Sequence, residues 1–155
     1  MPLTLNYSSY AEAPTYIPQS DLNELSDDNL NTATAVQNTI EQALFDSESL
    51  VDGYLSQEID VPAKASDGTV PGIVKQWTYA VARYFLLRRR NAAREEAQKD
   101  YDKVISELEK AAKGEIKIIL KTSAGVDETP LESLLYDTMD EDNFLFTDTK
   151  MVGVL

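Results

Sequence analysis

The chain contains no cysteine and no histidine among its 155 residues. The lack of cysteine excludes disulfides, thiolate zinc sites and cysteine nucleophiles, and it fits a protein made in a reducing cytosol. The lack of histidine removes the commonest general base and metal ligand, and with it serine–histidine and cysteine–histidine catalysis. The 27 acidic residues are spread along the chain rather than paired in an apolar setting. We therefore predict that the protein is not an enzyme and holds no metal or cofactor.

Long apolar runs and glycine-rich loops are also missing. No stretch approaches the ~18 apolar residues of a transmembrane helix, and MPLTLNYSSY lacks the basic and apolar regions of a signal peptide. The six glycines form no phosphate-binding loop. We expect one domain with tails, no membrane partner and no nucleotide cofactor.

Basic residues are absent from the first part of the chain. Residues 1–63 hold eleven acids and no lysine or arginine, whereas residues 64–121 hold thirteen bases and eight acids. Residues 122–155 return to one base and eight acids, and the whole chain has a net charge of -13. Such a chain repels nucleic acid phosphates, so we predict no specific DNA binding.

Apolar residues recur at three- and four-residue spacing in three long segments, which predicts amphipathic helices. The helices are expected at about 33–57, 71–90 and 92–113. Asn31 or Thr32 is expected to cap the first, and Gly114 to end the third. The second has the widest apolar face, with Trp77, Tyr84 and Phe85, so it is expected at the centre of a bundle. Gly53 in the first helix is explained by close packing of another helix or by a kink.

The fold class that follows is mainly α: a small helical bundle of three long helices plus a short N-terminal one. Residues 1–18, with three prolines and three tyrosines, are predicted as an extended N-terminal arm, and residues 19–114 as the bundle. Residues 115–121 alternate polar and apolar side chains, which predicts one short β-strand. Ile116, Ile118 and Leu120 would pair it with the arm or with another subunit. Residues 122–155 are predicted as an extended acidic C-terminal arm.

Five arginines form the densest positive charge in the sequence: Arg83, Arg88, Arg89, Arg90 and Arg94. Cations near the end of a helix interact favourably with its dipole, which is the plain explanation. The functional alternatives are salt bridges to acidic surfaces of neighbouring subunits and, less favoured, contacts with DNA. Asp52 with Asp60, and residues 140–143, are weak candidates for a cation site because no EF-hand spacing is present.

The last twelve residues, FLFTDTKMVGVL, form an apolar strip on a highly acidic chain. We expect this strip to dock on another protein and to order on binding, because an unattached apolar terminus frays in water. The docking side chains would be Phe144, Leu145, Phe146, Met151, Val152, Val154 and Leu155.

The ordered set of these pieces resembles the Mu-like phage head-completion (neck) family, a branch of the head–tail connector proteins. The resemblance covers about residues 17–118 and, loosely, the last twelve. It is carried by Asp52-Gly53-Tyr54-Leu55, Pro62 and Pro71, Ala82-Arg83-Tyr84 with Arg88–Arg90, Tyr101, Leu108, Lys113-Gly114, and Phe146-Thr147-Asp148 with Met151 and Gly153.

This resemblance implies a structural virion protein without catalysis, made in the host bacterial cytoplasm and located at the neck. Relatives form a ring, usually twelve-fold, beneath the portal protein, extend the DNA channel and offer a platform to the next neck or tail component. An alternative that the acidic composition leaves open is a DNA mimic that inhibits a nucleic-acid enzyme. A tail terminator with a mainly β fold is a further alternative, disfavoured by the helical pattern.

Overall fold

A computed structural model describes residues 3–26, 32–92, 94–122 and 124. The helices are α1 (Ala13–Tyr16), α2 (Gln19–Ser26), α3 (Ala33–Leu55), α4 (Gly72–Arg89) and α5 (Glu95–Ala112). The mainly α fold and the three long helices are therefore confirmed. Two short helices rather than one precede them, because Ala13–Tyr16 forms an additional turn with proline at its start.

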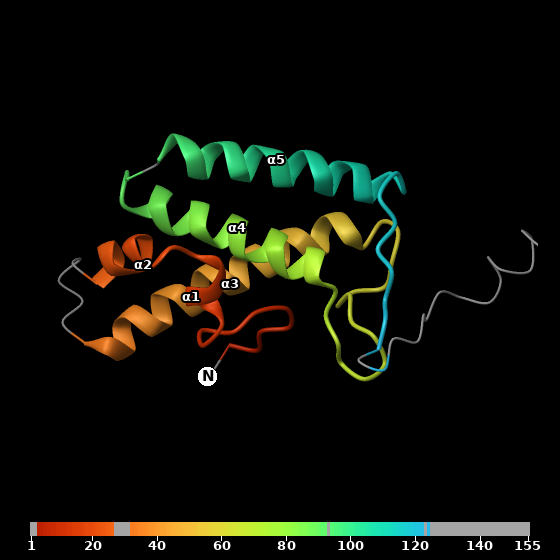
Figure 1. Ribbon diagram of the computed structural model, residues 1–155, viewed down its shortest axis with the longest axis horizontal. Coiled ribbons are helices and arrows are strands. Elements are labelled where there is room, and N and C mark those ends of the chain that lie inside the picture. Colours follow the sequence, from red (N-terminus) through yellow and green to blue (C-terminus); the bar gives the residue numbers. More distant parts are fainter. Residues whose placement is uncertain (1–2, 27–31, 93, 123, 125–155) are drawn as a thin grey trace, which may run out of the picture.

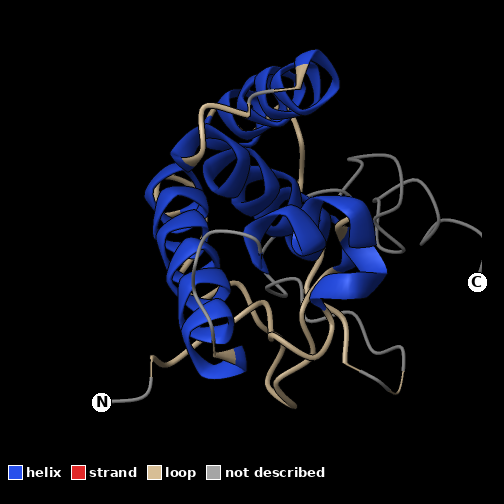
Figure 2. Ribbon diagram, turned by 90° about the vertical axis from the view of Figure 1, so that its left-hand side faces the viewer, coloured by secondary structure: helices blue, strands red, loops and turns tan. Residues whose placement is uncertain are grey.

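The helices form a bundle in which α4 lies between α5 and α3 (Figure 1). Helix α4 contacts each of the other four, and nine of its residues are buried, including Val74, Trp77 and Val81. The central position predicted from its wide apolar face is thus confirmed. Figure 2 shows the bundle from one end, and helices are the only regular elements among the described residues.

Local signals set most helix ends. The Thr32 hydroxyl accepts a hydrogen bond from the Ala35 N–H at 3.2 Å and caps α3. Gly114 adopts a φ of 72°, and the N–H groups of Gly114 and Glu115 bind the carbonyls of Ala111 and Lys110. This pattern is a Schellman motif, in which the left-handed residue favours glycine. Helix α4 ends in the same way, with Asn91 at a φ of 52°.

Two apolar clusters form the core. One joins α3, α4 and α5 and includes Trp77, Leu55 and Leu108, while the other joins α1 and α2 to α3 and α4 through residues such as Leu44 and Ile17. The aromatic prediction is confirmed for Trp77, which is buried. Tyr84 and Phe85 are only partly buried.

Of the two explanations for Gly53, close packing of another helix is wrong, and the kink stays a prediction. A Cβ at this position would meet no atom within 4 Å, so no helix in the described part of the chain packs against it. The residue lies on an exposed face of α3.

The predicted strand at residues 115–121 is also wrong as a regular element. Among the described residues, only Lys121 forms a β-bridge, and residues 117–120 have no assigned secondary structure. The alternation arises because the chain runs along the end of the bundle. Ile116, Ile118 and Leu120 turn toward the first core cluster, and the residues between them face outward.

Candidate functional site

The N-terminal segment is held on the bundle by one buried carboxylate. Glu48 of α3 accepts hydrogen bonds from the backbone N–H groups of Asn6, Tyr7 and Ser8 at 2.6, 2.8 and 2.9 Å, and from the Ser8 hydroxyl at 2.6 Å. Glu48 is 3% exposed, so these four donors replace the water that an ionised carboxylate needs. The arm predicted over residues 1–18 is therefore not extended throughout: Ala13–Tyr16 is helical, and the segment before it packs on the bundle.

Two tyrosines reinforce this attachment. The Tyr7 hydroxyl donates to the Asp52 carboxylate and accepts from the Ala63 N–H at 2.7 Å, linking the segment to α3 and the following loop. The Tyr79 hydroxyl of α4 accepts from the Ser9 N–H at 2.9 Å. Burial raises the pKa of Tyr79 to about 12 and, together with the bond to Asp52, raises the pKa of Tyr7 further above its usual value. Burial also raises the pKa of Asp52.

A cluster of ion pairs around the buried Asp21 joins α2 to α4 and to the N-terminal end of α5. Asp21 lies 2.6 Å from the Arg83 guanidinium and 2.6 Å from that of Arg94. Arg83 also approaches Asp100 at 3.3 Å, and Arg94 pairs with Glu24. Two of the five arginines expected at subunit contacts thus bind acids of their own chain. Neither lies in the last turn of a helix, so the dipole explanation does not apply to them, and their contact with neighbouring subunits stays a prediction.

The other three arginines lie at the C-terminal end of α4. Arg88 and Arg89 are exposed and Arg90 is partly buried. Near them, Tyr84 of α4 stacks on Tyr101 of α5 with ring centroids 4.1 Å apart. Their position at a helix end agrees with the dipole explanation, and their role toward other subunits stays a prediction.

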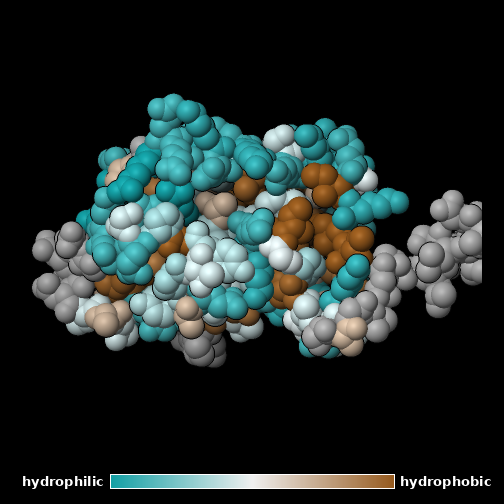
Figure 3. All heavy atoms as spheres, viewed as in Figure 1, coloured by the Kyte–Doolittle hydropathy of each residue, from teal (hydrophilic) through white to brown (hydrophobic). Residues whose placement is uncertain are grey.

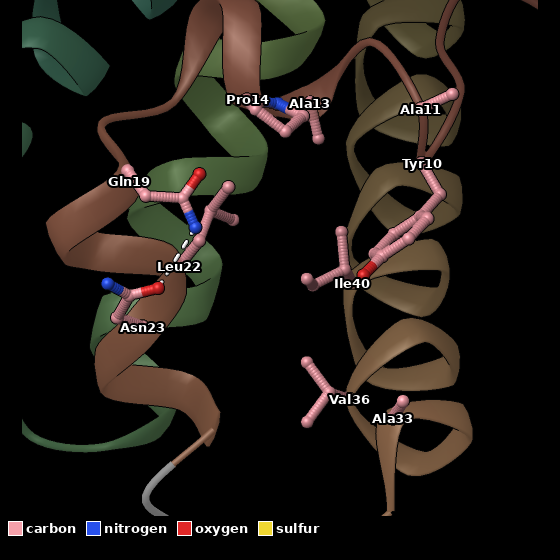
Figure 4. A pocket seen from close by; sticks show the side chains of 10 residues that line it. All are labelled: Tyr10, Ala11, Ala13, Pro14, Gln19, Leu22, Asn23, Ala33, Val36 and Ile40. Carbon is pink, nitrogen blue, oxygen red and sulfur yellow. Dashed lines mark hydrogen bonds between the residues drawn. The ribbon is translucent and has the colours of Figure 1, made fainter.

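An apolar groove opens where α1 and α2 face α3. Leu22 of α2 lies across the groove from Val36 and Ile40 of α3, with Pro14 and Tyr10 along its upper part (Figure 4). The side-chain amides of Gln19 and Asn23 on the α2 side bind each other at 2.9 Å. The groove has a volume of about 430 Å³, and none of its lining residues carries a charge at neutral pH. A concave surface of this kind suits an apolar side chain.

A second apolar surface covers the end of the bundle at which α3 and α5 terminate. Hydrophobic side chains gather there in Figure 3. Ile119 is 45% exposed, the highest value among the exposed large apolar side chains, and Val61 and Ile73 are each 38% exposed. A hollow of about 700 Å³ is lined by Ile118 and Leu120 together with residues of the loop after α3, among them Glu58, Asp60 and Lys64.

The predicted docking strip, residues 144–155, lies outside the described residues. The candidate cation site at residues 140–143 lies outside them as well. Within the described part of the chain, no three acidic side chains come together in a way that would hold a metal ion. In that same part, no helix has both the length and the apolar character needed to cross a membrane.

The groove and the Glu48 contacts were not predicted from the sequence. Glu48 lies about forty positions from its donors, and its place on the apolar side of an otherwise regular amphipathic helix is the one signal that could have indicated a buried acid. The groove depends on how α1 and α2 sit on α3, for which the sequence carries no pattern.

Comparison with known proteins identifies related sequences. A family profile described as "Bacteriophage Mu, Gp36" matches residues 7–134. A protein described as "Mu-like prophage FluMu protein gp36", from Haemophilus influenzae, is 36% identical to the chain over 90 residues. The matched region covers 58% of this chain and 57% of that relative, so somewhat more than half of each protein is compared.

Proposed function

The chain belongs to the bacteriophage Mu Gp36 family, and from this premise we propose that it is a head–tail connector of the virion. In this role, copies of the chain form an oligomeric ring under the portal protein, in the twelve-fold arrangement that the family resemblance implies. The ring extends the DNA channel and joins the head to the next neck or tail component. The protein acts at the neck, after its synthesis in the host cytoplasm.

The observation that carries this proposal is the pair of apolar surfaces at opposite ends of a small bundle. One is the groove between α2 and α3, and the other is the surface around Ile118 and Ile119. Contiguous apolar surfaces on a protein of this size favour contacts with other proteins.

Charge supports passage of DNA rather than its capture. The net charge of -13 repels phosphates, and a channel wall of this character lets a duplex slide without adhering. The exposed Arg88 and Arg89 at the end of α4 are then proposed to contact acidic surfaces of neighbouring copies. Contacts of this kind weaken as salt concentration rises.

The test is size-exclusion chromatography with light scattering on the full-length chain and on a chain ending at Asn143. Each is run alone and with the portal protein of the same phage. We expect the full-length chain to co-elute with the portal as a ring, and the shortened chain to lose this association because the apolar strip is removed.

Failure of both chains to bind the portal would contradict the connector proposal and favour an acidic DNA mimic, which inhibition of a nuclease or repressor would then reveal. Equal binding of both chains to the portal would be consistent with the connector role but would show that the apolar strip is not needed for portal binding.

A further inference from the structure

One extended segment of the surface has a backbone that makes no hydrogen bonds within the described part of the chain. Residues 117–120 follow the Schellman motif at the end of α5 and cross the end of the bundle beside the loop after α3 (Figure 1). None of their backbone N–H or C=O groups is paired with the backbone of another described residue. An extended segment of this kind is a template onto which a strand of another chain can add.

The side chains of this segment alternate as those of a β-strand do. Ile118 and Leu120 pack against the first core cluster, which fixes the segment on the bundle. Lys117, Ile119 and Lys121 point outward and are exposed. The backbone is therefore already held in the alternating arrangement of a strand, so an incoming strand does not have to order it.

Space for an incoming strand lies beside the segment. The hollow of about 700 Å³ at this end of the bundle is lined by Ile118 and Leu120 together with Ile59 and Pro62 of the loop after α3. Its volume lies within the range of ligand-binding pockets. Apolar side chains on the inner face of an added strand would be buried there.

The charge beside the segment favours an acidic partner. Residues 113–121 hold three lysines and one glutamate, on a chain whose net charge is -13. Lysine ion pairs among the described residues involve other lysines, and not Lys117 or Lys121. Opposite charges that face each other across paired strands stabilise the pair, so acids opposite these two lysines are favoured.

We propose that residues 117–121 bind an extended segment of another protein by β-strand addition. The partner residues opposite Lys117 and Lys121 are acidic, and the residue opposite Ile119 is apolar. The two residues between them lie on the inner face and enter the hollow, so they are apolar as well. The partner segment therefore reads acid, three apolar residues, acid. The inference rests on the proposed function only in treating this surface as a protein contact, and it needs neither the ring nor the portal.

Two other occupants of this edge fit the structure less well. The N-terminal arm, which the sequence offered as a strand partner, is bound elsewhere, because residues 6–8 donate to Glu48 on α3. A second copy that paired the two exposed Ile119 side chains would set Lys117 of each copy opposite Lys121 of the other. Like charges directly opposite each other destabilise a strand pair, so an acidic partner is favoured.

The experiment measures binding of synthetic peptides to the full-length chain by fluorescence anisotropy. The probe has the sequence Asp-Val-Ile-Val-Asp between Gly-Ser ends, and the matched peptide has lysine in place of both aspartates. We expect the aspartate peptide to bind about ten-fold more tightly, because two opposite-charge pairs replace two like-charge pairs.

Methylation of the peptide backbone tests whether the main chain carries the contact. Alternate N–H groups of a strand point to opposite edges, so only one alternate set faces the partner. N-methylation of that set should abolish binding of the aspartate peptide, whereas N-methylation of the other set should leave it. Equal effects of the two methylated peptides would contradict strand addition.

Charge reversal on the chain provides the matched control. The double variant Lys117→Glu, Lys121→Glu should exchange the preference, so that the lysine peptide binds about ten-fold more tightly than the aspartate peptide. The double variant Lys99→Glu, Lys103→Glu changes the net charge equally at side chains of α5 that are 72% and 76% exposed. It should keep the original preference. The same response of both variants would show an effect of net charge alone.

Hydrogen exchange of the full-length chain locates the contact. The amides of residues 117–120 should gain protection when the aspartate peptide is added. Protection without peptide that rises with protein concentration would assign the edge to a second copy and would overturn the proposal.

Three further results would overturn it: no binding at about 1 mM aspartate peptide, a concentration that detects even weak recognition, equal binding of the aspartate and lysine peptides, or binding without protection of residues 117–120. In each case the connector function stands if the full-length chain still joins the portal. Failure to join the portal by a chain that binds the aspartate peptide would instead contradict the proposed function alone.

Discussion

Asp21 of α2 lies 2.6 Å from Arg83 of α4, and both side chains are almost fully buried, with exposed fractions of 3% and 11%. Two elements separated by 62 positions are thus joined through an ion pair shielded from water. Arg94 approaches the other oxygen of the same carboxylate. The short helix α2 therefore depends on a charge cluster as well as on apolar contacts such as that of Leu22.

Removal of this carboxylate is expected to destabilise the fold strongly. Asp21→Ala leaves the Arg83 guanidinium buried without its main partner, which costs about 3–5 kcal/mol in the free energy of unfolding. Glu96→Ala is the control, because Glu96 is 76% exposed and lies 3.9 Å from the same guanidinium. Its loss is expected to cost less than about 0.5 kcal/mol. Urea denaturation followed by circular dichroism measures both, and similar values would contradict the assigned role of Asp21.

Glu48→Gln is expected to release the N-terminal segment. One oxygen of the carboxylate becomes an NH₂ group that faces backbone donors, so at least one buried N–H loses its acceptor. We expect a loss of about 2–4 kcal/mol, the range for hydrogen bonds to a charged group together with an unsatisfied donor. Limited proteolysis measures the release, since cleavage in residues 3–16 should become faster than in the control Glu41→Gln, whose carboxylate accepts a hydrogen bond from the Gln37 side chain of the same helix. Unchanged protection would show that the tyrosine contacts suffice.

Stability is expected to fall at alkaline pH. The pKa of Tyr79 in the folded chain is about 12, against 10.0 for the ordinary side chain. The folded state therefore keeps a proton that the unfolded state loses, so this contribution is complete below pH 10 and is lost between pH 10 and 12. Tyr7 acts in the same direction. The Tyr7→Phe, Tyr79→Phe double variant should lose less of its stability over this interval than the unmodified chain, measured by denaturation at each pH.

The titration itself can be followed by ultraviolet absorption of the phenolate at 295 nm. Tyr7 and Tyr79 should ionise above the ordinary tyrosine pKa of 10.0 in the folded chain and near that value in denaturant. Tyr10→Phe, at an exposed position, is the control for the general effect of losing one hydroxyl. Ionisation of Tyr7 and Tyr79 at the ordinary pKa in the folded chain would contradict the burial assigned to these two side chains.

Replacement of two glycines by alanine is expected to change the stability of the fold in opposite directions. Gly53→Ala adds a methyl group to open space in the interior of α3 and should stabilise the chain by about 0.5–1 kcal/mol. Gly114→Ala forces a φ of 72° on a residue with a Cβ, which would also lie 3.3 Å from Glu58. That variant should be less stable by about 1 kcal/mol or more. Thermal unfolding compares them, and stabilisation by both would contradict the assigned Schellman motif.

The helices were predictable because their signals are local. The apolar stripe of residues 33–55, the hydroxyl of Thr32 and the glycine at position 114 each act within a few positions of the chain. The strand prediction at residues 115–121 failed because an extended chain lying on the edge of a core shows the same alternation as a strand in a sheet. Only the availability of a partner strand separates the two, and that is a property of the whole fold.

The site was less predictable for the same reason. The sequence placed Arg83 and Arg94 in its densest group of positive charges, but their partner Asp21 lies more than sixty positions earlier. Both arginines also sit among others that are exposed, which hides the difference between them. The docking role of Phe144 and its neighbours stays a prediction, since these residues lie outside the described part of the chain.

Glu48 binds the N-terminal segment mainly through its backbone, so the contact depends little on which side chains the segment carries. Three of its four hydrogen bonds come from main-chain N–H groups, which every residue except proline supplies. The N-terminal segment can therefore accept many substitutions at Asn6 without losing its place on the bundle, whereas a proline at positions 6, 7 or 8 would remove a donor. Substitutions on the outward side of this segment can thus change its surface chemistry while the same acid keeps the backbone in place.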